Sequence, residues 1–371
     1  MTLTEEHADL ARAVRSVLER QSGPAEVRAA VDRPRGYDEK LWSVLCEQIG
    51  VAALPIPERF GGVGAGVVEL QVVAEELGRG VTPGPLLGST VLATSALLAS
   101  GDDAACARLL PALAHGNALA ALAWTDSRGR WDAATAAFTA VPADGEYIMD
   151  GCAHYVLDGD YADTVLLVAR CGEEAGLFEV DPEQESVHRQ QSATMDQTRR
   201  LATVSLSAAR ACRIGAGDFR QALSDARDTA CAVLAAEQVG TASAALAATV
   251  EYTKNRVQFG RAIGGFQALK HRMADMHVLV ESARSACYAA GEAIAESTPD
   301  AARAALTAKV YCSEALSAVA AEMIQLHGGI AITWEHDAHL YFKRAHSGAQ
   351  LFGQPQEHLA RLDHLMGSSR E

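Results

Sequence analysis

Helical periodicity dominates both ends of this sequence and is absent from its middle, and this order limits the folds that the chain can adopt. Apolar residues recur at the spacing of amphipathic helices in residues 1–118 and again in residues 214–371. Residues 119–213 instead contain short alternating runs between turn residues, a pattern typical of β-strands. The sequence therefore predicts an N-terminal helical domain, a central β domain and a C-terminal helical bundle, divided at these ranges.

The individual segments can be placed by the same criteria. The predicted helices cover residues 5–21, 38–51, 66–80, 218–255, 266–293 and 299–326, with a shorter one ending near Leu362. Residues 55–66 are rich in Pro and Gly, so we expect a tight connection there. In the β domain, Asp150-Gly151 and Asp158-Gly159 predict hairpin turns.

Composition excludes several classes of protein. The net charge of -15 argues against nucleic acid or an anionic membrane surface as a partner, because both would be repelled. The first ten residues, MTLTEEHADL, have neither a basic nor an apolar leader, and we expect a cytoplasmic protein. The eight cysteines form no metal-binding pattern and are expected to be small buried residues: Cys46, Cys106, Cys152, Cys171, Cys212, Cys231, Cys287 and Cys312.

Two Gly-containing joins between long helices are the candidates for a binding site. The first, RVQFGRAIGGFQ, places Arg256 at a helix end and Gln267 at the start of the next helix. A guanidinium beside side-chain-free backbone suits a diphosphate, although a surface Arg with an ordinary turn explains the same letters. The second, QLHGG at 325–329, follows a long apolar helix, where two Gly residues are also compatible with a simple helix end.

Taken together, the two joins resemble a known family. The pair R-x-x-F-G…F-Q and Q-x-x-G-G is similar to the C-terminal half of the acyl-CoA dehydrogenases. PERFGGVGAGVVELQVVAEELGRG and DGCAHYVLDGDYAD resemble two more segments of that family, in the same order along the chain. The resemblance implies a mainly helical fold with a central β-barrel and a C-terminal four-helix bundle, assembled as dimers or dimers of dimers.

The resemblance also implies a cofactor and the residues that hold it. FAD would lie across a subunit interface, with its ADP half held by this chain and its ring in the neighbouring subunit. The residues at the matching positions are Arg256, Phe259, Gln267, Gln325, Gly328 and Gly329. We expect these six residues to form a flavin clamp.

The segments that hold the flavin ring in the family are altered in this chain. The family's T-E-P-G-A-G-S-D loop reads TDSRGRWD at 125–132, and its W-I-T segment reads Tyr155-Val156-Leu157. Thr125 keeps its hydroxyl and is a further candidate for cofactor binding. Leu157 cannot donate a hydrogen bond to the flavin edge, and the two Arg and the Trp in the loop are bulkier than the residues they replace. A complete ring pocket is therefore not expected here.

The catalytic base of the family is also missing from its usual places. Removal of the α-proton of an acyl-CoA needs a carboxylate, which most members carry in a Y-E-G-T segment. Phe352 occupies that position here, and Ala230 occupies the alternative position on the first bundle helix. Glu237, seven residues further along that helix, is a weak candidate, and Asp228 is a weaker one, so the base remains unassigned.

Three hypotheses follow from this pattern. The chain could be a self-sufficient homo-oligomeric acyl-CoA dehydrogenase with a displaced base, or a relative that performs another flavin oxidation or oxygenation. The favoured hypothesis is a subunit of a two-chain enzyme, because TRRLA, TWEHDAHLY and LFGQPQEH resemble the heteromeric dehydrogenases of steroid side-chain CoA esters. The expected partners are an acyl-CoA thioester, an electron-accepting flavoprotein and a sister chain.

Overall fold

The computed structural model of the chain describes residues 3–132 and 135–368, which form two compact units. The first unit contains the chain up to Val31, Val67–Pro83 and the chain from Cys231 onward. The second contains Asp32–Gly66 and Gly84–Ala230. The boundary near residue 230 falls inside the long helix α7 (Arg220–Asn255), which therefore contributes to both units.

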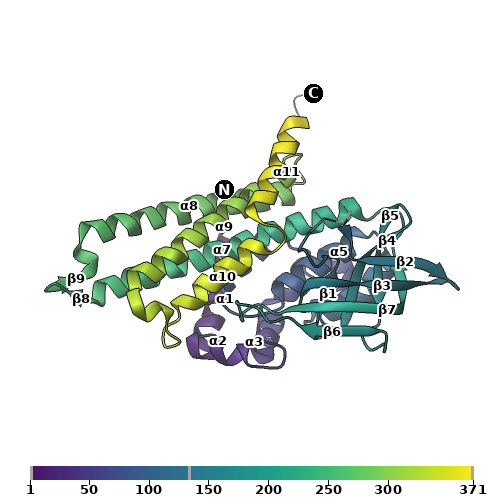
Figure 1. Cartoon of the computed structure of the whole chain (residues 1–371), viewed down its shortest axis with the longest axis horizontal. Helices are drawn as coiled ribbons and strands as arrows, with labels where there is room; N and C mark the ends of the chain where they lie inside the picture. The colour runs from purple at the N-terminus through teal and green to yellow at the C-terminus, as the bar shows by residue number, and fades with distance from the viewer. Residues whose placement is uncertain (1–2, 133–134, 369–371) are drawn as a thin grey trace. The chain divides into compact units, whose positions relative to one another are not determined.

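The first unit is a helical bundle (Figure 1). Besides the second part of α7, its helices are α1 (Glu5–Gln21), α2 (Pro24–Val31), α4 (Val67–Arg79), α8 (Gln267–Ala295), α9 (Ala301–His327), α10 (Ala338–Gln350) and α11 (Pro355–Ser368). Helix α1 begins with a capping box in which the Thr4 side chain accepts from the His7 amide. The core between the long helices is apolar and includes Met276, Leu316 and Met323.

Glycine allows α4 to approach its neighbours very closely. A Cβ atom at Gly78 would lie 2.1 Å from the carbonyl oxygen of Glu237, and one at Gly240 would lie 1.9 Å from that of Glu75. At Gly291 on α8, a Cβ atom would lie 1.9 Å from Gln71 Oε1. The backbones of α4 and α7 are therefore in direct contact, with no space for side chains between them at this level.

The second unit is built around a closed sheet. Its strands are β1 (Ala120–Ala123), β2 (Phe138–Ala143), β3 (Glu146–Leu157), β4 (Thr164–Cys171), β5 (Glu174–Val180), β6 (Val187–Gln191) and β7 (Leu201–Ile214). Strand β5 pairs with both β7 and β4, which closes β4-β2-β3-β7-β5 into a barrel. Buried residues such as Phe138, Met149 and Phe178 fill its interior. The predicted mainly helical fold with a central β-barrel is confirmed.

Shorter helical elements complete the second unit. They are α3 (Glu39–Val44), η1 (Leu45–Ile49), η2 (Val51–Ala53), η3 (Glu58–Phe60), η4 (Leu86–Ala93), α5 (Thr94–Ala99) and α6 (Asp103–Ala114). The helix predicted over 38–51 is therefore one α-helical turn and a half followed by a π-helical stretch. It ends at Gly50, whose φ of 79° lies in the left-handed region that glycine favours.

Both predicted hairpin turns were wrong. Asp150-Gly151 lies inside β3 at a β-bulge opposite β7, where a Cβ atom on Gly151 would lie 2.3 Å from the carbonyl oxygen of Ala137. Asp158-Gly159 forms a turn, but the strands on its two sides, β3 and β4, pair with other strands. The tight hairpin is at Asp144-Gly145, between β2 and β3, and both of its residues have positive φ angles.

Cysteine burial is also only partly as expected. Five of the eight are buried, whereas Cys152 and Cys212 are exposed and Cys171 is half-buried. The two exposed thiols lie on strands whose outer faces are open, where alternation places every second side chain outside the barrel.

Two helical stretches are long and apolar enough to cross a membrane. They are Arg220–Asn255 and Ala301–Ile332. In the first, 72% of the most apolar 18-residue stretch is buried inside the protein. A long apolar helix is expected in the core of a soluble bundle, so burial explains the composition of α7. In Ala301–Ile332, only 44% of the corresponding stretch is buried.

Candidate functional site

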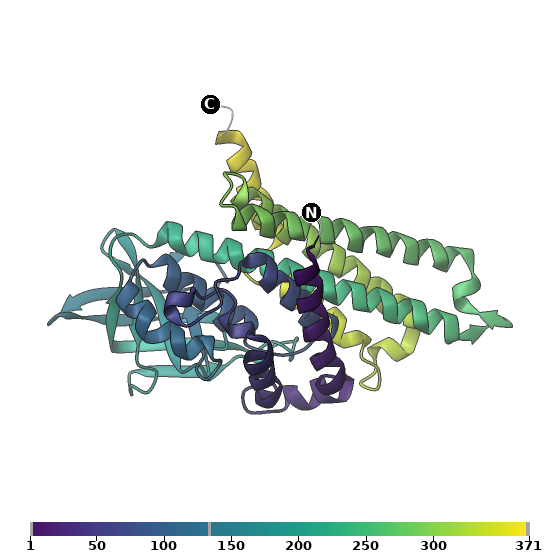
Figure 2. The same ribbon diagram turned by 180° about the vertical axis from the view of Figure 1, so that it is seen from behind.

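The first candidate join forms a β-hairpin at the end of α7. Strands β8 (Val257–Gln258) and β9 (Arg261–Ala262) pair around the two-residue turn Phe259-Gly260. Figure 1 and Figure 2 both show this hairpin at the far end of the α7–α8 pair. The φ angles of the turn residues are 53° and 76°, as in a type I′ turn. Phe259 is 91% exposed, so an aromatic ring is held in solvent by a backbone conformation that Phe rarely adopts.

The rest of the hairpin holds Arg256 and Gln267 at the surface. The carbonyl oxygen of Arg256 accepts a hydrogen bond from Ile263 N at 2.8 Å, and both predicted side chains are exposed. Gly264 lets the chain return beside α7, because a Cβ atom there would lie 3.0 Å from the carbonyl oxygen of Thr253. Among residues 3–132 and 135–368, no carboxylate pairs with Arg256, so its guanidinium is available to an anionic ligand.

The second candidate join exposes its backbone. Helix α9 ends at His327, and Gly328 has φ 68° and ψ -150°, a conformation that is open only to glycine. A Cβ atom at Gly328 or Gly329 would meet nothing within 4 Å, and Gln325 is exposed one turn earlier. The 3-10 segment η7 (Gly328–Ile332) follows. The peptide groups of this turn can therefore be approached closely by a ligand.

An aromatic contact connects the two joins. Tyr252, one turn before Arg256 on α7, donates a hydrogen bond to the carbonyl oxygen of His327 at 3.2 Å. The rings of Tyr252 and His327 are stacked with centroids 4.3 Å apart. The structure thus connects the end of α7, which leads into the hairpin, with the QLHGG turn. An exposed Arg and an open glycine backbone are both groups that can contact a phosphate.

The loop at 125–132 is firmly attached within the second unit but is not an open cradle. Thr125 is buried, and its carbonyl oxygen accepts from His154 N at 2.8 Å. Trp131 is also buried, packs edge-on against Trp124 at 5.2 Å, and accepts a hydrogen bond from Arg227 at its carbonyl oxygen. The bulky replacement of the family's Ser is therefore part of a local aromatic core.

The positions expected for a base carry no usable carboxylate. Phe352 is 1% exposed and has a φ of 63°, and Ala230 is completely buried. Glu237 accepts a hydrogen bond at 2.9 Å from Arg344, whose side chain is 5% exposed and also donates to the carbonyl oxygen of Val81. Asp228 lies 3.5 Å from Arg227. Glu237 therefore compensates a buried guanidinium, which disfavours a role in proton abstraction.

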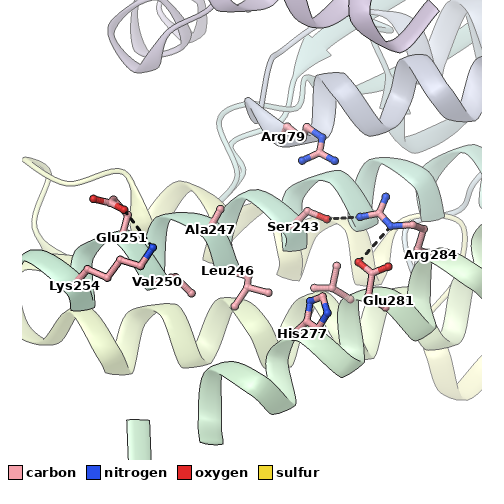
Figure 3. A pocket seen from close by; sticks show the side chains of 11 residues that line it. Arg79, Ser243, Leu246, Ala247, Val250, Glu251, Lys254, His277, Glu281 and Arg284 are labelled. Carbon is pink, nitrogen blue, oxygen red and sulfur yellow. Dashed lines mark hydrogen bonds and ion pairs between the residues drawn. The ribbon is translucent and has the colours of Figure 1, made fainter. Parts of the chain in front are cut away.

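A pocket of about 400 Å³ lies between α7 and α8 in the first unit. Figure 3 shows apolar side chains, among them Leu246 and Val250, in its middle, and the Glu251–Lys254 pair at one end. At the other end Arg284 donates to Ser243 at 2.9 Å and pairs with Glu75. The charges that line this pocket are balanced by near neighbours, and it contains none of the predicted clamp residues.

Comparison with known proteins identifies the family. Residues 4–117 match the model of the acyl-CoA dehydrogenase N-terminal domain, and residues 204–362 match that of the C-terminal domain. The chain belongs to the acyl-CoA dehydrogenase family. It is therefore an oxidoreductase of the type that acts on a CH–CH bond, and membership implies a flavin cofactor.

Several members of the acyl-CoA dehydrogenase family are similar over the whole chain. Acyl-CoA dehydrogenase IpdE2 of Mycobacterium tuberculosis is 44% identical, with 98% of each chain covered. A solved variant of the steroid enzyme Tcur3481–Tcur3483 is 31% identical with a TM-score of 0.90, covering 100% of this chain and 99% of that one. The ChsE4–ChsE5 complex from Mycobacterium tuberculosis is 27% identical with a TM-score of 0.90, covering 99% and 98%.

Sequence reasoning missed the residues that support these sites. Arg344, Arg227 and Tyr252 are all partners of predicted positions but carry no motif of their own. The available signal for Arg344 was a basic residue within the helical segment 338–350. If such a residue is buried, it requires a carboxylate partner elsewhere in the chain.

Proposed function

We propose that this chain is the flavin-clamping, base-lacking subunit of a heteromeric acyl-CoA dehydrogenase. The enzyme would catalyse α,β-dehydrogenation of an acyl-CoA thioester, with FAD held at the boundary between unlike chains. The single observation that carries the proposal is the contrast between the two sites. The clamp residues Arg256 and Phe259 are exposed, and no carboxylate of the described residues pairs with Arg256, whereas Phe352 and Ala230 close the base positions.

Five of the six clamp residues have distinct tasks in this proposal. Arg256 would pair with the diphosphate of FAD, and the peptide groups of Gly328 and Gly329 would lie against it. Gln267 and Gln325 would donate or accept hydrogen bonds at its edges. The bound flavin supplies the hydride acceptor for the reaction. The proton-abstracting carboxylate would come from the sister chain, because Glu237 is paired with Arg344.

Exposed apolar side chains support assembly with another chain. Val257 and Phe259 on the hairpin are 58% and 91% exposed, and Ile332 and Trp334 after the QLHGG turn are 74% and 65% exposed. Large apolar groups gathered on the two candidate segments are typical of an interaction surface. Within Ala301–Ile332, only 44% of the most apolar 18-residue stretch is buried, which agrees with this proposal. The similar solved structures of the Tcur3481–Tcur3483 steroid enzyme and of the ChsE4–ChsE5 complex, each named for two components, support it further.

Several further predictions belong to the same proposal. They are a cytoplasmic location, an electron-accepting flavoprotein as redox partner, and a division of the chain into 1–118, 119–213 and 214–371. Thr125, which is buried, stays a candidate for the flavin ring.

The proposal is tested by measuring flavin content. The chain is expressed alone and together with a candidate sister chain of the same family from the same genome, and FAD is counted per subunit in each purified product. We expect about one FAD per pair of unlike chains, and only on co-expression. Full occupancy in the lone chain, with dehydrogenase activity, would instead establish the homo-oligomeric alternative with a displaced base.

A further inference from the structure

His336 lies in the loop that joins the QLHGG turn to α10, and its ring holds the start of that helix. Its Nδ1 accepts a hydrogen bond from the backbone N–H of Ala338, the first residue of α10, at 3.1 Å. The first N–H groups of a helix have no partner within the helix, so the imidazole acts as a cap. This contact requires an unprotonated Nδ1, because a protonated imidazole has no acceptor.

The same ring packs against the clamp turn. The ring of His336 is tilted against that of His327, with centroids 4.8 Å apart, and His327 is stacked on Tyr252, whose ring lies edge-on to His336 at 6.4 Å. His327 Nδ1 contacts the carbonyl oxygen of Met323 at 2.8 Å, so this nitrogen carries the hydrogen in the neutral ring. Three rings from α7, α9 and the loop therefore form one cluster, and His327 in it directly precedes Gly328 and Gly329.

The surroundings of this ring cluster disfavour an added positive charge on a histidine. Burial and the neighbouring His336 lower the pKa of His327. On the outer side, Arg28 from α2 donates to the carbonyl oxygen of His336 at 3.2 Å and to the carboxylate of Asp337 at 2.7 Å. The remaining titratable groups around the ring are Tyr252 on α7, Glu335 in the loop, and His339 and Lys343 on α10.

Protonation of His336 would therefore have three unfavourable consequences. It removes the acceptor for Ala338 N–H, it places a cation at the N-terminus of α10, and it adds charge beside the stacked ring of His327. Asp337 is already paired with Arg28, which limits its ability to compensate. We propose that His336 is a proton-sensitive latch: its neutral ring holds the Gly328–Gly329 turn in place, and protonation releases the loop and weakens the flavin clamp.

The link to flavin rests on the proposed function, whereas the release of the loop does not. The test therefore uses two measurements on the co-expressed assembly at about pH 7.5 and about pH 5, across the range in which histidines titrate. Hydrogen exchange of residues 328–345, corrected for intrinsic rates, reports on the loop. The FAD dissociation constant reports on the clamp. The variants are His336→Asn, whose amide oxygen can cap without titrating, and His346→Asn as a control on the same helix.

In the wild type and in His346→Asn, we expect exchange in 328–345 to rise about 5- to 10-fold at the lower pH, the scale of a lost cap. The FAD dissociation constant should rise by a similar factor, because the clamp is weakened. His336→Asn should keep its protection and its FAD affinity at both values. If His336→Asn shows the same pH response as the wild type, the latch is refuted. If exchange responds to pH through His336 while FAD affinity does not, the latch stands and the clamp assignment of Gly328 and Gly329 fails.

Discussion

Replacement of Phe259 by Asn separates the folding of the β8–β9 hairpin from its use as an anchor. Asn-Gly is the preferred pair for a type I′ turn, and the observed φ angles of 53° and 76° are those of such a turn. A Phe in this region costs about 1 kcal/mol or more. Phe259→Asn should therefore leave the free energy of unfolding of the chain unchanged or raise it by up to about 1 kcal/mol.

The same substitution should weaken assembly. Because Phe259 is 91% exposed, nearly its whole side chain is available for burial against a cofactor or sister chain. Complete burial of a Phe side chain contributes about 1.5–3 kcal/mol. Its loss corresponds to roughly 10- to 150-fold weaker association.

The assay combines thermal unfolding of the lone chain with titration of the sister chain and measurement of bound FAD. Gln258→Ala, on the same hairpin and also exposed, is the matched control and should change association by less than about 5-fold, since it removes no large apolar side chain. Unchanged association and flavin content in Phe259→Asn, with a folded hairpin, would refute the anchoring role.

Three further substitutions test other parts of the structure. Arg256→Ala should weaken FAD binding by about 1.5–3 kcal/mol. Arg261→Ala, which removes a charge from the same hairpin, should not weaken it. Equal losses in both variants would assign the effect to the net charge of the hairpin. Glu237→Gln should keep the activity of the assembly within about 2-fold but lower the free energy of unfolding by about 1–3 kcal/mol, because Arg344 loses its charged partner; abolished activity in a folded variant would restore Glu237 as the base. Burial raises the pKa of Asp158 to about 7, so its folded pKa exceeds its unfolded value and its contribution to stability is lost as pH rises from about 4 through 7. Asp158→Asn should remove up to about 4 kcal/mol of this pH dependence in thermal unfolding, and an unchanged slope would contradict the buried, neutral carboxyl.

The long helices could be predicted because their signal is local and repeated. Predicted segments at 218–255, 266–293 and 299–326 correspond to α7 (Arg220–Asn255), α8 (Gln267–Ala295) and α9 (Ala301–His327). Many turns of one period leave little ambiguity.

The strand connections could not be predicted in the same way. Three Asp-Gly pairs have equal turn chemistry, and only the pairing partners select Asp144-Gly145 as the hairpin. Gly151 is instead required because the carbonyl oxygen of Ala137, the residue before β2, approaches its backbone closely. The local sequence does not encode this contact.

In the candidate site, too, local motifs could be predicted whereas long-range contacts could not. The clamp motifs are short and could be placed from the sequence, although their role remains a prediction. The Arg344–Glu237 pair joins residues 107 positions apart, and the Tyr252–His327 contact spans 75. Such contacts depend on the packing of α7 against α9 and α10, which no single segment specifies.

The backbone contact between α4 and α7 limits how this chain can diverge. Because Gly78 and Gly240 each face a carbonyl oxygen of the other helix, even one added methyl group at either position would force the two helices apart. Residues beside the crossing, including Glu75 and Glu237, would then move away from Arg284 and Arg344 together. Substrate range in descendants of this chain should therefore change through residues away from the crossing, while the two glycines stay fixed.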